Sequence, residues 1–149
     1  METIAVFVND LDHARHILQP MLRGAEPTRW VLVACPPVLT RHIGRWVSHG
    51  ARLQWRERWA AELFAALGPE LRAVTGSELE TLVPSRPLAE VSARLLARWP
   101  QLRALDVRRP RVGRIDEPIS ATQPAAGASR WTAPAAATAG LSVVLALAD

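Results

Sequence analysis

The stretch at residues 4–10, Ile-Ala-Val-Phe-Val-Asn-Asp, decides the fold class of this chain. Its first part is an uninterrupted apolar run, rich in β-branched and aromatic side chains, which is typical of a strand buried on both faces of a parallel sheet. Asn9 and Asp10 end the run, and Asp10 is a good N-cap for a following helix. Because a parallel strand of this kind needs helices on both faces of its sheet, the sequence predicts an α/β fold.

The same alternation of apolar run and helical periodicity continues along the chain. Further strands are predicted at residues 30–35, 80–84, 102–107 and 141–147, and helices at 11–23, 39–67 and 87–99. Pro20 is expected to bend or shorten the first helix, and Gly68-Pro69 to end the long one. This order predicts a three-layer α/β/α sandwich with a five-stranded, mostly parallel sheet.

Length and composition fit one domain over residues 1–149. The chain has 49% hydrophobic and 21% charged residues, which is ordinary for a globular protein. Residues 108–138 lack sustained periodicity, so we expect an irregular segment there, with a short Ala-rich helix near 133–139.

Charge and cysteine usage exclude few classes of function. All 18 basic residues other than histidine are arginine, and the formal net charge of +4 is too small to indicate a polyanion by itself. The single cysteine, Cys35, excludes an intramolecular disulfide and favours a cytoplasmic setting. The N-terminus lacks the features of a secretory signal, and the uncharged stretch at 131–148 is too poor in strongly apolar residues to predict a membrane anchor.

Four stretches resemble the universal stress protein family. They are the first strand with the acidic residue at its end, the long second helix, the sequence Pro-Leu-Ala-Glu-Val from Pro87 into the next helix, and the apolar strand at 141–147. The resemblance extends over most of the chain as a layout. It implies that ATP is a possible ligand at the carboxyl ends of the strands and that the terminal strand pairs across a homodimer.

The nucleotide-binding motif of that family is not preserved here. Members that bind ATP carry a glycine-rich segment after the fourth strand, whose backbone amides hold phosphates. Gly113 can replace one of these glycines, but Asp116 stands in the same segment. The arginines of this segment either replace the missing glycines as anion-binding groups or form a solvated basic loop. On the first reading, the predicted ligand-binding residues are Asn9, Asp10, Arg109, Gly113 and Arg114.

Two smaller groups of residues are candidates for metal or nucleophilic chemistry. Asp10, Asp12, His13 and His16 gather at the start of the first helix, where a metal site competes with simple capping and dipole effects. His42 and His49 lie too far apart along a helix to share a metal, and Cys35 at the end of a buried strand fits a structural thiol. We therefore predict neither a metal site nor a catalytic residue.

Arginines also follow one side of the long helix. Their stripe has two tryptophans, Trp55 and Trp59, nearby, and it consists of Arg41, Arg45, His49, Arg52 and Arg56. Such a pattern suits either a subunit interface or nucleic acid, and the small net charge favours the interface. The predicted interface residues are Trp55, Trp59, Val143 and Leu145.

The sequence thus predicts a universal stress protein-like regulatory or stress-response module that acts mainly by self-association and binds an anionic small molecule or nucleotide. The alternative is a nucleic-acid-binding accessory protein that uses the arginine stripe. An enzyme ranks last, because no set of metal ligands with a general base is recognisable.

Overall fold

The computed structural model describes residues 1–38, 45–111, 116–121 and 143–145. Its sheet has the strand order β3-β2-β1-β4-β5, and every pairing is parallel. The body of the sheet consists of β1 (Glu2–Val8), β2 (Thr28–Ala34), β3 (Glu78–Leu82) and β4 (Arg103–Asp106). The short β5 (Val143–Leu145) pairs with the outer side of β4.

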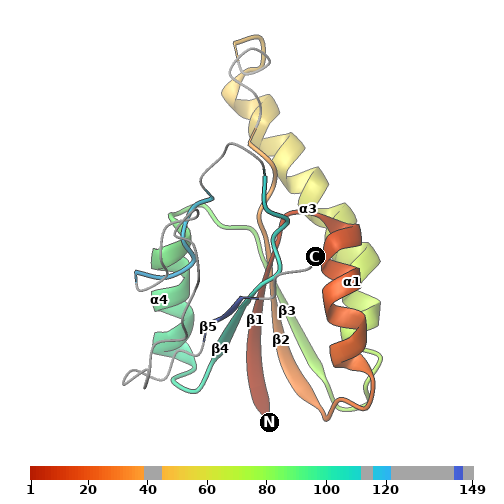
Figure 1. Cartoon of the computed structure of the whole chain (residues 1–149). Coiled ribbons are helices and arrows are strands. Elements are labelled where there is room, and N and C mark those ends of the chain that lie inside the picture. Colours follow the sequence, from red (N-terminus) through yellow and green to blue (C-terminus); the bar gives the residue numbers. More distant parts are fainter. Residues whose placement is uncertain (39–44, 112–115, 122–142, 146–149) are drawn as a thin grey trace.

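Helices cover both faces of this sheet (Figure 1). On one face lie α1 (Leu11–Leu22) and α3 (His49–Leu71), and on the other lies α4 (Leu88–Arg98). The predicted parallel α/β architecture is therefore confirmed. The third strand begins and ends two residues earlier than predicted, and β5 is shorter than the predicted strand at 141–147.

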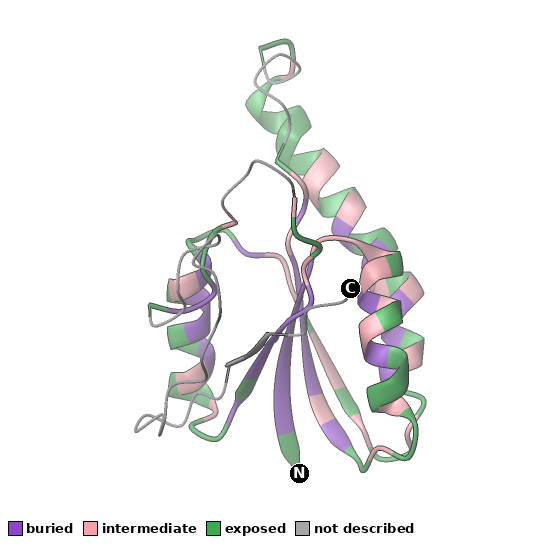
Figure 2. Ribbon diagram, in the orientation of Figure 1, coloured by how far each residue is buried: buried purple, intermediate pink, exposed green. Residues whose placement is uncertain are grey.

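The central strand β1 separates two cores because its side chains alternate between the faces. Val6 and Val8 pack with α1 and α3, whereas Ala5 and Phe7 pack with α4. All four are fully buried, as the purple centre of the sheet in Figure 2 shows. Burial on both faces is the physical reason for the uninterrupted apolar run in the sequence.

The helix boundaries follow from local chemistry, with two corrections. Asp10 caps α1 as predicted, its Oδ1 accepting from the backbone N–H of His13 at 2.9 Å. The long helix was predicted to begin at residue 39, but residues 45–48 form no helix and it begins at His49, where Ser48 caps it. It then runs through Gly68 and Pro69 to Leu71. The prediction that Gly68-Pro69 ends the helix was wrong. A residue before proline normally avoids the helical region because its Cβ clashes with the proline ring, and Gly68 has no Cβ.

Most of the predicted irregular segment at 108–138 lies outside the described residues, and so does the predicted Ala-rich helix. The described part at 116–121 contains neither helix nor strand, yet Ile119 is fully buried beneath α4. Within the parts of the chain that the structure describes, no helix has the length and apolar character to cross a membrane.

Candidate functional site at the carboxyl edge of the sheet

The candidate site lies where β1 and β4 are neighbours at the centre of the sheet. From β1 the chain continues to one side, towards β2 and β3, while β4 and β5 extend to the other side. At such a point the connections leave the two strands in opposite directions, so a crevice forms at their carboxyl ends, where open α/β sheets bind ligands.

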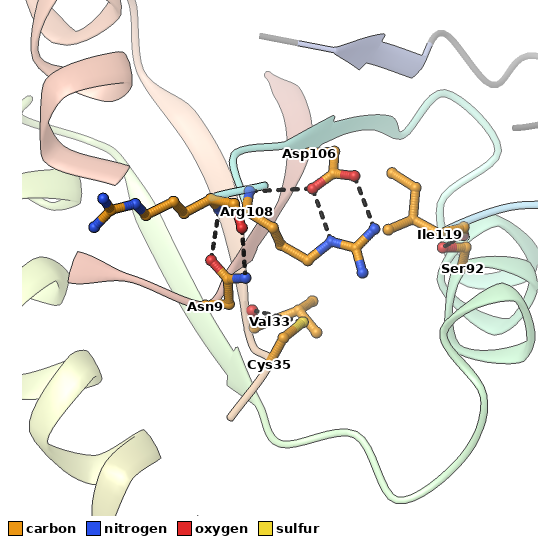
Figure 3. A network of polar contacts seen from close by, with 8 residues as sticks. Asn9, Val33, Cys35, Ser92, Asp106, Arg108 and Ile119 are labelled. Atoms are coloured by element: carbon orange, nitrogen blue, oxygen red, sulfur yellow. Dashed lines mark hydrogen bonds and ion pairs between the residues drawn. The ribbon is translucent and has the colours of Figure 1, made fainter. Parts of the chain in front are cut away.

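Asn9 joins the ends of these two strands. Its Oδ1 accepts from the backbone N–H of Arg109 at 2.6 Å, and its Nδ2 donates to the carbonyl of Arg109 at 3.2 Å (Figure 3). A side-chain amide offers one acceptor and two donors, so it satisfies both backbone groups at once. The effect is to fix the path of the chain as it leaves β4.

Asp106 and Arg108 form a buried ion pair beside this clamp. The guanidinium donates Nε and Nη2 to the two carboxylate oxygens at 2.9 Å each, while the backbone N–H of Arg108 donates to Oδ1 at 3.1 Å. Both side chains are only 7% exposed. Burial works to lower the pKa of Arg108, but the hydrogen bonds and charge of Asp106 outweigh it and raise this pKa above its ordinary value.

A cavity of about 290 Å³ opens at this edge of the sheet. Its walls come from the ends of β1, β2 and β4, from α3, and from the connection between β3 and α4. The lining residues are Asn9, Cys35, Pro36, Pro37, Val38, Arg56, Pro84, Arg86, Leu88, Arg108, Arg111, Asp116 and Glu117.

The charged side chains around the cavity are mainly basic, with four arginines against two carboxylates. Arg56 donates to the carbonyl of Pro84 at 3.1 Å, and Arg86 lies 3.6 Å from Glu90 on the surface. Arg111 has no hydrogen bond or ion pair with any described residue. A guanidinium without such a partner at the wall of a cavity is able to bind an anion through paired N–H donors.

Glu117 lines the cavity at the start of α4. Its Oε1 accepts from the backbone N–H of Leu88 at 2.7 Å, at the start of α4, where Pro87 makes no side-chain cap bond. Ser92 of α4 also donates to the carbonyl of Ile119 (Figure 3). Two anchors thus hold the segment at 116–121 against α4 and place a carboxylate at the positive end of that helix.

Cys35 lies in the wall of the cavity but is a poor nucleophile. Its backbone N–H donates to the carbonyl of Val8 at 2.7 Å, which extends the pairing of β1 and β2. Burial raises the pKa of the thiol to about 12, in spite of the opposing charge of Arg108. The thiol therefore stays protonated at neutral pH, as a structural cysteine does.

The structure brings together three of the five predicted ligand-binding residues. Asn9 lines the cavity, Asp10 caps α1, and the exposed side chain of Arg109 lies 3.8 Å from Asp10. Neither Asp10 nor Arg109 is among the lining residues, and Arg109 meets Asn9 through its backbone. Gly113 and Arg114 lie outside the described residues.

Sequence reasoning did not assign Arg86, Asp106 or Glu117 to this site. A signal for Arg86 existed, because residues that follow parallel strands meet at the same edge of a sheet and Arg86 follows the third strand. Nothing local indicates that Glu117, 29 residues away in the chain, supplies the acceptor at Leu88.

The other predicted groups form no second site among the described residues. No cluster of three potential metal ligands occurs there, and His13 and His16 are not joined into one. Trp59 packs against the core of its own chain, and Trp55 is half-buried. The side chains of Val143 and Leu145, like Arg41 and His42, lie outside the described part.

A parallel α/β sheet with this strand order is consistent with a Rossmann-like α/β fold. Comparison with known protein families, with curated proteins and with solved structures yields no match.

Proposed function

We propose that this protein is a regulatory α/β module that binds a small phosphate-type anion in the cavity at the carboxyl edge of its sheet. The observation that carries the proposal is the arginine-rich wall of this cavity, in which Arg111 has no partner among the described residues. The proposal retains the predicted likeness to universal stress proteins, which the parallel strand order and the position of the crevice support.

Size and charge narrow the class of ligand. The cavity of about 290 Å³ is at the lower limit of common ligand pockets, so it suits a phosphate or pyrophosphate group better than an entire nucleotide. Planar guanidinium groups bind phosphate oxygens in pairs, and partial burial strengthens each contact. ATP remains a possible ligand if its nucleoside extends out of the cavity.

We expect pyrophosphate to raise the melting temperature of the full chain. At a concentration one hundred times the dissociation constant, a ligand that binds only the folded state adds about 2.7 kcal/mol of stability. Arg111→Ala should weaken binding at least about tenfold, because it removes the unpartnered guanidinium. A thermal-shift titration with phosphate, pyrophosphate and ATP, with and without magnesium, measures the first effect, and calorimetric titration with the same ligands measures the second.

Two variants sharpen this experiment. Glu117→Gln keeps an acceptor for the Leu88 N–H but removes a negative charge from the cavity wall, so it should tighten anion binding. Arg23→Ala removes an exposed arginine just after α1, outside the cavity, and should leave binding unchanged. If none of the three anions binds, or if Arg23→Ala weakens binding as much as Arg111→Ala, the cavity is not the anion site.

Self-association through β5 remains the second part of the proposal. β5 lies at the end of the strand order and pairs with β4 on one side, and no other described strand pairs with its second side. Such an edge is a template for a strand from a second copy. Light scattering during size-exclusion chromatography should give twice the chain mass, and a strictly monomeric mass at all concentrations would contradict this part.

A further inference from the structure

The amino-terminal half of α3 extends past the sheet (Figure 1). The helix has 23 residues and is therefore about 35 Å long. Its buried residues begin only at Ala60, and every residue from His49 to Gln54 is exposed. This half of α3, together with the turn at residues 45–48, is here called the overhang (Figure 2).

The overhang is basic and carries exposed apolar side chains. Glu57 is the only acidic residue between positions 45 and 58, against four arginines, namely Arg45, Arg52, Arg56 and Arg58. Trp46 is 83% exposed and Leu53 is 48% exposed. An indole with this exposure, next to Arg45 in the chain, has an open aromatic face on a basic segment.

The basic side of the overhang leads into the anion cavity. His49, Arg52 and Arg56 follow one another at spacings of three and four residues, so they share one side of the helix. Arg56 shows where this side points, because its Nη2 donates to the carbonyl of Pro84 and its side chain lines the cavity. Positive groups therefore continue from the overhang to Arg86 and Arg111 in the cavity wall, where Arg108 is already paired with Asp106.

From this arrangement we infer that the overhang and the cavity together bind single-stranded nucleic acid. Phosphodiester groups lie along the arginine side of the overhang, a base stacks on Trp46, and a terminal phosphate enters the cavity. The last contact rests on the proposed function; the first two do not. Arginines with an exposed aromatic ring are the usual elements of a surface that binds single strands without reading their sequence.

Charge and base stacking favour a single strand over a second copy of this chain or a nucleic-acid duplex. A second copy would bring like charges together if it docked through the same surface. A nucleic-acid duplex keeps its bases inside, where Trp46 cannot stack on them. A single strand offers phosphates to the arginines and an unpaired base to the exposed indole of Trp46.

The test is fluorescence anisotropy of the full chain with a short single-stranded oligonucleotide labelled at its 3′ end, with and without a 5′ phosphate. Binding should fall steeply with salt concentration, and each of Arg45→Ala and Arg52→Ala should reduce the log–log salt slope by about one unit or less. Trp46→Ala should weaken binding about fivefold or more through lost stacking. The control variant Arg23→Ala should bind like the original chain.

The two proposals fail in different ways. Arg111→Ala should lose the preference for a 5′ phosphate and still bind the unphosphorylated strand. That result supports both the anion cavity and the nucleic-acid surface. Strand binding without any pyrophosphate binding overturns the anion cavity and leaves the overhang as the nucleic-acid surface. No strand binding at low salt, equal competition by an acidic polypeptide, or no effect of Trp46→Ala and Arg52→Ala overturns the nucleic-acid inference.

Discussion

Asp106→Ala should lower the free energy of unfolding by about 3–5 kcal/mol. The substitution removes the carboxylate that accepts three hydrogen bonds from Arg108, whose side chain is only 7% exposed. The guanidinium then remains buried without its counter-ion, and that uncompensated charge accounts for most of the expected loss. Chemical denaturation, followed by tryptophan fluorescence and by circular dichroism, measures the change.

A matched control is the exposed ion pair between Glu80 and Arg98. Arg98 donates to both oxygens of Glu80 at 2.9 Å, a two-point geometry like that of the buried pair, but its side chain is 62% exposed. Glu80→Ala should therefore cost at most about 1 kcal/mol. Asp106→Ala combined with Arg108→Met should regain much of the lost stability. A loss for Asp106→Ala no larger than that for Glu80→Ala would contradict the argument.

The fold was predictable because strands buried on both faces appear in the sequence as apolar runs. β1 and β2 lie between two layers of helices, and after two polar residues at the start of each strand their residues are all apolar. The edge strand β3 carries Glu78 and Glu80, which form ion pairs at the surface. This strand therefore gave a weaker signal, and its boundaries were predicted two residues too late.

The end of the long helix shows where local propensity fails. Gly68 and Pro69 normally end helices, yet α3 continues for two residues beyond them. Leu71 is fully buried in the core with α1 and β2, so tertiary packing stabilises a last turn that propensity disfavours.

The candidate site was only partly predictable, because its contacts join residues that are distant in the chain. Asn9 and Asp10 are recognisable in the sequence because they follow an apolar run directly. Open α/β sheets bind ligands at the carboxyl ends of their strands, which predicts a ligand near these two residues. The clamp from Asn9 to Arg109 spans 100 residues, and the acceptor that Glu117 supplies to Leu88 spans 29. No periodicity encodes such pairings.

Ile119 is a second contact that the sequence pattern does not reveal, and its substitution is expected to cause the second large loss of stability. It lies in a stretch predicted to be irregular, and yet its side chain is fully buried in the core between the sheet and α4. Ile119→Ala should therefore lower the free energy of unfolding by about 2–5 kcal/mol, through lost burial and the cavity that remains. The reason is that the segment at 116–121 belongs to the folded core rather than lying over it as a loose loop.

A second readout separates this explanation from a general loss of stability. Glu117 accepts from the Leu88 N–H only while the segment is held against α4, so Ile119→Ala should accelerate hydrogen exchange at Leu88 more than at Phe7 in the central strand. Ile17→Ala, on the opposite face, removes a half-buried side chain and should cost less. If Ile119→Ala costs less than about 1 kcal/mol and leaves the Leu88 amide protected, the segment does not complete the core, and the carboxylate wall of the cavity loses its anchor.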